Sequence, residues 1–208
     1  MSLATHARAG LVAVVLSLTP ALVACSGDDA PDPVAVSTPA TPLESFATES
    51  LTGVRGPFCE AIADTEVAEL LDSPVTKATS YDNGERARVV DGTKDVAHEF
   101  SCTWRTEDAT VARAWVFAPP VTPARARDLA RDLARAARTG EGCAKVKGAP
   151  AFGAPSVAVR CTEGRISTVS FHGLFGAAWL SCSVESRGPD VLDLAGRWCV
   201  LAAQAASE

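Results

Sequence analysis

Apolar and charged residues alternate with a helical period between Pro123 and Thr139, which makes this segment the clearest element in the sequence. Thr122 precedes it as an N-cap, proline occupies its first position, and Gly140 follows its last one. With about 3.6 residues per turn, apolar side chains gather on one face and four arginines on the other. The apolar side chains are Ala126, Leu129, Ala130, Leu133, Ala136 and Ala137, and the arginines are Arg127, Arg131, Arg135 and Arg138.

Strand patterns in the first half run from Val75 to Tyr81, from Glu99 to Arg105 and from Thr110 to Phe117. The Gly- and Asp-bearing stretch 82–95 is expected to be a loop or hairpin. Side chains of the third strand alternate between two faces. One face holds Val111, Arg113, Trp115 and Phe117, and the other holds Ala112, Ala114 and Val116.

The second half of the chain echoes this order. Strand patterns run from Arg165 to Phe171 and from Ala177 to Glu185, and a closing amphipathic helix runs from Pro189 to about Gln204. A turn at 57–62 and a helix from Thr65 to Leu71 come before the first strand. The order predicts an α+β domain with an antiparallel sheet and flanking helices, and the echo suggests an internal duplication.

The segment from Ser26 to about Gly53 is rich in Pro, Ser, Thr, Ala and Asp and holds few apolar residues. Segments of this composition bury too little apolar surface to pack. We therefore expect residues 25–54 to contain a disordered tether and residues 55–208 to form a single domain.

An apolar stretch from Leu11 to Val23 follows a weakly basic N-terminus. As a helix it rises only about 20 Å, short of the ~30 Å hydrocarbon core of a membrane, so residues 1–24 fit a secretory signal peptide. The run Leu22-Val23-Ala24-Cys25 at its end resembles the lipobox of bacterial lipoproteins. The resemblance implies that Cys25 is lipidated and anchors the protein to the extracytoplasmic side of the cell membrane.

Six further cysteines follow Cys25, and an even number in an exported chain predicts disulfides. A metal site would need Cys-x-x-Cys pairs or interleaved histidines, and the sequence has neither, so we expect no metal. Six cysteines allow fifteen pairings, and the sequence does not select one. We expect consecutive cysteines to pair, as Cys59–Cys102, Cys143–Cys161 and Cys182–Cys199.

Residues 25–208 carry 18 basic and 25 acidic side chains, because residues 1–24 contain one of the chain's 19 basic residues and none of its acids. The resulting net charge of −7 argues against a nucleic-acid partner, since such binders gain affinity by neutralising phosphates.

The four helix arginines allow two interpretations. They form a docking surface for an anionic partner such as lipid headgroups or wall polymer, or they form a solvated helix face balanced in part by Asp128 and Asp132. The solvated face is favoured, because a long tether holds the domain beyond the ~10 Å range of membrane charge.

The sequence contains no G-x-S-x-G, His-Glu-x-x-His, P-loop or G-x-G-x-x-G motif. His98 and His172 are the only histidines after residue 24, and a lone histidine lacks the second group that catalysis requires. We expect His172 to be a satisfied strand-end histidine rather than part of a ligand lid, and we expect no cofactor. A hydrolase with two converged carboxylates stays open, because Glu and Asp are plentiful.

Aromatic side chains on the second and third predicted strands of the first half also allow two interpretations. Trp104, Trp115 and Phe117, with Arg105 and Arg113, would suit a groove for a sugar or peptide. Core and edge packing is favoured for aromatic residues on strands.

Three sequence runs together resemble a family of actinobacterial lipoproteins defined by a domain of unknown function. They are Phe58-Cys59-Glu60-Ala61-Ile62, Glu66-Val67-Ala68-Glu69-Leu70-Leu71 and Cys102-Thr103-Trp104. Family members share a lipobox, a Pro/Ser/Thr-rich linker, a Cys before a short helix and a later Cys-x-Trp. Asp72-Ser73-Pro74 stands here where a glycine often closes the helix, and two extra cysteine pairs are present.

The resemblance implies a fold and a compartment but no activity. We therefore expect a membrane-anchored, non-catalytic binding or interaction module of the cell envelope, whose partner is a protein, lipid or glycan. The alternative is a cell-wall-active hydrolase that uses paired carboxylates.

Overall fold

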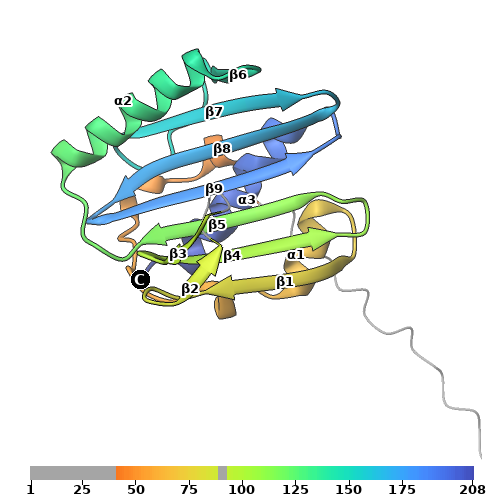
Figure 1. Ribbon diagram of the computed structural model, residues 1–208, viewed down its shortest axis with the longest axis horizontal. Helices are drawn as coiled ribbons and strands as arrows, with labels where there is room; N and C mark the ends of the chain where they lie inside the picture. The colour runs from red at the N-terminus through yellow and green to blue at the C-terminus, as the bar shows by residue number, and fades with distance from the viewer. Residues whose placement is uncertain (1–40, 89–92) are drawn as a thin grey trace, which may run out of the picture. The chain divides into compact units, whose positions relative to one another are not determined.

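A seven-stranded antiparallel sheet organises the residues that the computed structural model describes, which are 41–88 and 93–208 (Figure 1). The strand order is β1-β4-β5-β9-β8-β7-β6, and a separate hairpin pairs β2 with β3. The strands are β1 (Val75–Tyr81), β2 (Arg86–Arg88), β3 (Lys94–Val96), β4 (Glu99–Thr106), β5 (Val111–Phe117), β6 (Cys143–Lys145), β7 (Ser156–Glu163), β8 (Ile166–Phe175) and β9 (Ala178–Ser186). The helices are α1 (Asp64–Leu71), α2 (Pro123–Thr139) and α3 (Val191–Ala205), with 3-10 turns at Leu43–Ser45, Thr48–Ser50 and Cys59–Ala61.

This architecture confirms the predicted α+β class. Helix α2 and strand β1 have the predicted bounds, and the predicted loop or hairpin at 82–95 contains β2 and the first two residues of β3. Strands β6 and β7 were not predicted. Each half of the chain supplies three neighbouring strands followed by a helix, β1-β4-β5-α2 in the first half and β7-β8-β9-α3 in the second. The two helices, however, pack on opposite faces of the sheet. The suggested internal duplication therefore extends to the order of the strands and not to the packing of the helices.

The packed unit begins earlier than the composition predicts. Residues 41–54 were expected to belong to the disordered tether, yet Leu43 is 4% exposed and lies against Gly196 of α3. The amide of Val54 donates to the carbonyl oxygen of Ala206 at 2.8 Å. Three apolar side chains anchor this segment to the core, and they are Leu43, Phe46 and Leu51. The prediction missed them because the average hydropathy of the segment is low. The predicted signal peptide (residues 1–24), Cys25 and residues 26–40 of the predicted tether lie outside the described residues.

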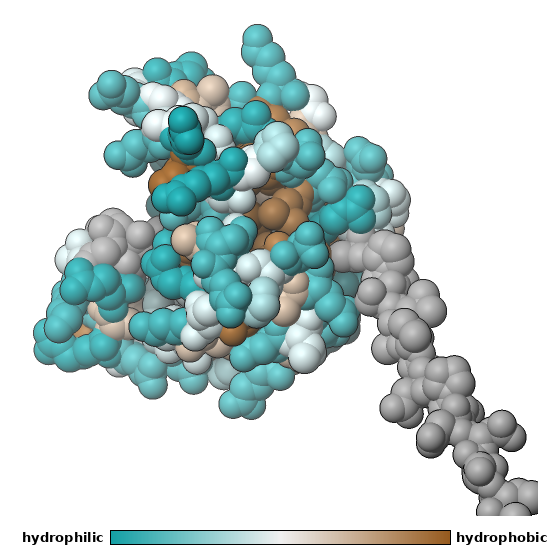
Figure 2. Space-filling view, turned by 90° about the vertical axis from the view of Figure 1, so that its right-hand side faces the viewer, coloured by the Kyte–Doolittle hydropathy of each residue, from teal (hydrophilic) through white to brown (hydrophobic). Residues whose placement is uncertain are grey.

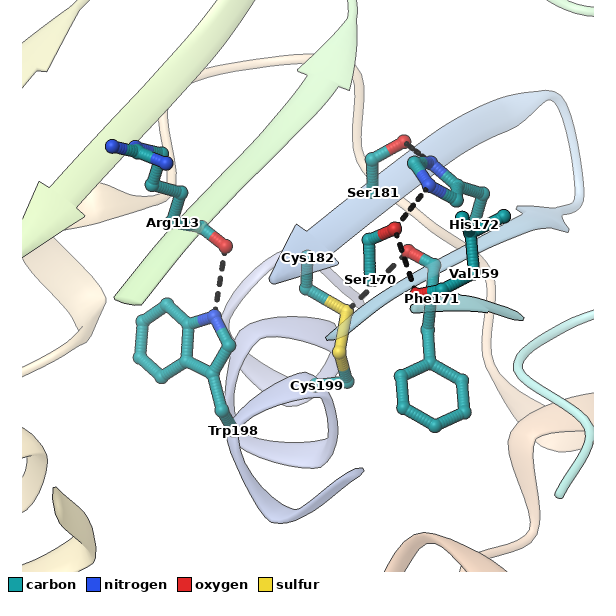
Figure 3. Close-up of a disulfide and its surroundings, with 9 residues drawn as sticks. All are labelled: Arg113, Val159, Ser170, Phe171, His172, Ser181, Cys182, Trp198 and Cys199. Carbon is teal, nitrogen blue, oxygen red and sulfur yellow. Dashed lines mark hydrogen bonds between the residues drawn. A yellow bond between two sulfur atoms is a disulfide. The ribbon is translucent and has the colours of Figure 1, made fainter. Parts of the chain in front are cut away.

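The main core lies between one face of the sheet and helices α1 and α3 (Figure 1). Trp198 of α3 is fully buried, and its indole nitrogen donates to the carbonyl oxygen of Arg113 on β5 at 2.8 Å. Its ring meets the ring of Trp104 edge-on, with 5.3 Å between the centroids. Close to this contact, the Cys182–Cys199 disulfide joins β9 to α3 (Figure 3).

The described cysteines form three disulfides, with the consecutive pairing expected from the sequence. Cys59–Cys102 ties the turn before α1 to β4, and Cys143–Cys161 joins directly opposed residues of β6 and β7. The third is the Cys182–Cys199 bond between β9 and α3. The sheet is therefore held covalently at its centre and at one edge.

Helix α2 packs on the opposite face of the sheet, over β7 and β8. Ala126 and Ala137 are buried there, and Leu129 and Leu133 are half-buried. Ala136 was predicted on the apolar face but is exposed, at the margin of that face. Thr122 caps the helix by accepting a hydrogen bond from the amide of Arg125 at 3.2 Å.

Gly173 on β8 provides a test of the core. A Cβ atom at this position would lie 1.5 Å from the backbone carbonyl oxygen of Phe152, in the segment that crosses the strand. Gly173→Ala therefore forces the backbone apart, and we expect a loss of about 3 kcal/mol in the free energy of unfolding, measured by denaturant titration. Gly188→Ala, whose added Cβ would come no closer than 3.5 Å to Ser186, should change it by less than about 0.5 kcal/mol. Equal effects of the two substitutions would contradict the packing described here.

Candidate functional site

The sheet face opposite α3 is only partly covered by α2, and its uncovered part is lined with polar side chains. We call this part the polar face. Register places its side chains in rows of directly opposed residues that cross β1, β4, β5, β9 and β8. One row is Tyr81, Ser101, Trp115, Ser181 and His172, and the next is Thr79, Thr103, Arg113, Ser183 and Ser170.

The surface is hollowed beside this face. Figure 2 shows a notch at its left side, between the part of the molecule that holds α2 and the part that holds the β2–β3 hairpin. In Figure 1 both of these elements lie in front of the sheet, on the side away from α1 and α3. The polar face therefore forms the floor of a depression with a helix on one side and a hairpin on the other.

His172 lies in the floor of the polar face with both ring nitrogens occupied. Its Nδ1 is 2.8 Å from the hydroxyl of Ser181, and its Nε2 is 3.0 Å from the hydroxyl of Ser170 (Figure 3). The ring is 6% exposed and meets the ring of Trp115 edge-on, with centroids 5.9 Å apart. Burial lowers the pKa of His172 to about 4. A neutral imidazole with two hydroxyl partners and no carboxylate partner is not arranged as a catalytic base.

The aromatic residues singled out in the sequence separate onto two faces. Trp104 is 3% exposed and belongs to the core beneath α3, where its indole nitrogen donates to Asp64 at 2.8 Å. This agrees with the favoured prediction of core packing and excludes the groove alternative for this ring. Trp115 and Phe117 are half-buried on the opposite face. Trp115 thus presents part of its ring on the polar face, while Phe117 packs beside the α2 contact.

A buried acid lies at one end of the polar face. The hydroxyl of Tyr81 donates to Oε1 of Glu99 at 2.5 Å, and Glu99 is 8% exposed. Burial raises the pKa of Glu99. The hydrogen bond from Tyr81 and the nearby charge of His98 lower this pKa, but they offset the effect of burial only in part. Burial, with the hydrogen bond to Glu99, also raises the pKa of Tyr81. The sequence pattern did not single out the Tyr81–Glu99 pair, because the two residues are 18 positions apart in the chain and lie on different strands.

The other end of the face holds an ion pair, in which Arg113 approaches Glu185 at 3.7 Å. Glu99 pairs with Phe117 across the sheet and Glu185 pairs with Val111, so the two acids are offset by six positions along β5. That spacing corresponds to about 20 Å along a strand, whereas paired carboxylates of glycosidases are roughly 5–10 Å apart. These two carboxylates therefore do not converge on one bond.

The predicted arginine face of α2 is exposed along its length. Arg131 pairs with Asp128, and Arg135 pairs with Asp132 at 3.3 Å, each three residues apart on the helix. Arg127 and Arg138 are also exposed. Exposed pairs of this kind contribute little to stability, and they reduce the positive charge that an anionic partner would meet.

In residues 41–88 and 93–208, no group of three or more His, Cys, Asp or Glu side chains is placed to hold a metal ion. Within these same ranges, no helix combines the length and the apolar character needed to cross a membrane.

The lowered pKa of His172 predicts a specific pH dependence of stability. The unfolded histidine, with a pKa of 6.5, binds a proton in a range where the folded one stays neutral, so stability falls as the pH decreases from 6.5 towards 4. The loss attributable to this group is roughly 3 kcal/mol at pH 4. His172→Gln should flatten the dependence in this window in chemical denaturation. Parallel curves for the wild type and His172→Gln would contradict the burial of the imidazole.

Comparisons with known proteins add little to this geometry. No protein-family model matches the chain, and a comparison with curated proteins gives no match. Among solved structures, the crystal structure of a GTP binding regulator from Thermotoga maritima is similar to 73% of this chain and 95% of its own, with 10% sequence identity and a TM-score of 0.35. A similarity of this size carries no argument about function.

Proposed function

We propose that this protein is a lipid-anchored, non-catalytic module of the cell envelope that binds a neutral glycan on its polar face. The observation that carries the proposal is the row Tyr81, Ser101, Trp115, Ser181 and His172. It places the half-buried indole of Trp115 and the half-buried phenol of Tyr81 over a polar layer of Ser101, Ser181 and His172, which are 1–6% exposed.

The chemistry of the face suits an uncharged polar ligand. Sugars offer hydroxyl groups for hydrogen bonds and apolar ring faces for contact with an aromatic side chain. The hydroxyls of Tyr81, Thr79 and Thr103, which are half-buried or exposed, supply the hydrogen-bonding partners that solvent reaches. The serines at the centre of the two rows, Ser101, Ser181 and Ser183, are at most 5% exposed and lie beneath them, and Trp115 supplies the aromatic surface.

Near the two ends of the polar face Arg113 is paired with Glu185, and Glu99 accepts a hydrogen bond from Tyr81. The row through Trp115 itself carries no acidic or basic side chain other than the neutral His172.

The proposed compartment follows from the disulfides and from the lipobox-like run. Three disulfides are typical of a domain that folds outside the cytoplasm. The run that ends at Cys25, together with the resemblance to actinobacterial lipoproteins, supports attachment through a lipid on that cysteine.

A wall hydrolase is the weaker alternative. Glu99, buried and with a raised pKa, has the character of a general acid. Its most evident partner on the seven-stranded sheet, Glu185, lies about 20 Å away by strand register. A non-catalytic role is therefore the better supported function.

Trp115→Ala tests the binding face. We expect Kd for neutral gluco-, manno- or galacto-oligosaccharides to rise about tenfold or more in calorimetry, with the Tm retained, because the ring is half-buried and contributes ligand contact. Arg127→Ala on α2 should leave Kd unchanged. Trp104→Ala should instead abolish the thermal transition, since that ring is buried in the core.

Two results would count against the binding proposal. Absence of binding by the wild type to all three oligosaccharide classes would overturn the glycan assignment. Release of new reducing ends that disappears in Glu99→Gln would favour the hydrolase.

Cys25→Ser tests the anchor in a bacterial host fed an alkyne-bearing fatty acid. We expect the variant to lose the lipid label and to leave the membrane fraction, because the thioether-forming side chain is gone. Ser26→Ala is the matched control and should keep both properties. Retention of the label in Cys25→Ser would place the lipid on another residue, and absence of the label from the wild type would refute the lipid anchor.

A further inference from the structure

The three disulfides differ in how far solvent reaches them. The bonds at the centre of the fold each contain at least one cysteine that is almost completely buried, whereas both cysteines of the edge disulfide are half-buried. The buried cysteines are Cys102 at 1% exposed and Cys182 and Cys199 at 0%. Only the edge disulfide, Cys143–Cys161, therefore presents both residues towards solvent among the described bonds.

This edge disulfide lies in the wall of a solvent-open hollow of about 620 Å³, built from β6, the β7–β8 turn and the end of β9. The residues of the wall that matter here are Cys143, Cys161, Thr168, Glu141, Glu163 and Glu185. Thr168 and Glu185 are directly opposed on β8 and β9, in the row that also contains Cys161. The hollow therefore adjoins the polar face.

We propose that Cys143–Cys161 is a thiol–disulfide exchange site whose reductant is a dithiol with positive charge beside its reacting thiol. Both cysteines line the open hollow, and exchange requires that a thiolate reach one of their sulfur atoms. Of the three glutamates in the wall, Glu185 is paired with Arg113, and Glu141 and Glu163 are exposed. Their charges repel an anionic reductant and attract a cationic one.

The exchange balances as a two-electron transfer. A thiolate of the dithiol attacks one sulfur of the bond, the Cys143–Cys161 bond breaks, a mixed disulfide forms, and the other cysteine leaves as a thiolate that takes a proton from water. The second thiolate of the dithiol then attacks the mixed disulfide and releases the first cysteine, which is protonated in turn. Cys143 and Cys161 end as thiols, and the dithiol ends as a disulfide.

Reduction removes the covalent link of β6, which is the shortest and outermost strand on its side of the sheet. Its three residues then keep only backbone pairing with β7 and flanking bonds such as that from the Thr162 amide to the Gly142 carbonyl oxygen at 2.9 Å. The disulfide also packs beneath the last turns of α2, next to Ala137. Exchange would therefore loosen β6 and the end of α2 without disturbing the core under α3.

The test uses the full-length chain in neutral detergent, treated at low salt with cysteamine or with 2-mercaptoethanesulfonate at equal thiolate concentration. New thiols are trapped with N-ethylmaleimide and assigned by peptide mass spectrometry, which separates Cys25 from the others. We expect Cys143 and Cys161 to be labelled at least about tenfold faster than the four other paired cysteines, and faster with cysteamine than with the sulfonate. Hydrogen exchange should rise in residues 140–146 after labelling.

The electrostatic part has its own control. Glu141→Gln combined with Glu163→Gln should lower the ratio of the labelling rate with cysteamine to the labelling rate with the sulfonate by about tenfold. Added salt should lower the same ratio. Glu69→Gln, on the exposed side of α1, should leave it unchanged. Simultaneous labelling of all three disulfides would overturn the exchange site, and an unchanged preference in the double variant would overturn the proposed reductant charge.

Discussion

The burial of α3 against the centre of the sheet is the contact on which the rest of the structure depends. Its side chains cover β5, β8 and β9, and Trp198 joins three parts of the fold through its contact with Trp104 and its hydrogen bond to β5. The Cys182–Cys199 bond fixes the helix to β9 within this contact. Because α3 is the last element of the described chain, the sheet cannot bury its apolar face until the C-terminal residues are in place.

The elements that the sequence predicted well carry local signals. Helix α2 has a capping threonine, a proline at its start and an uninterrupted apolar face, so its bounds follow from nearest neighbours alone. Strand β7 was missed because apolar residues occupy both of its faces, Ala158 under α3 and Val157 and Val159 under α2, which removes the alternation expected of a half-exposed strand. The packed segment at 41–54 was missed because a few anchoring side chains are diluted by polar ones.

The polar face was beyond sequence reasoning for a different reason. Its rows join residues from strands that are adjacent in the sheet but distant in the chain, as in the step from Trp115 to Ser181. Periodicity alone does not show that Trp104 and Trp115 lie on opposite faces of the sheet. That difference follows only from the register of β4 and β5, in which Trp104 pairs with Ala112 and Trp115 pairs with Ser101. The same register that assembles the hydroxyl rows also brings Cys161 into line with Thr168 and Glu185, so the disulfide at the sheet edge adjoins the margin of the polar face.

The segment before β1 gives the domain an unusual mechanical property. Gly53 bridges Ser207, and the amide of Glu208 donates to the carbonyl oxygen of Thr52 at 3.2 Å, so the first and last parts of the described chain are joined side by side. With the proposed anchor, any tension transmitted along the chain to residue 41 would load these bonds and the Leu43 contact with α3 before it reached the sheet. Residues 41–54 would then detach first under tension, while the sheet and its polar face stay folded.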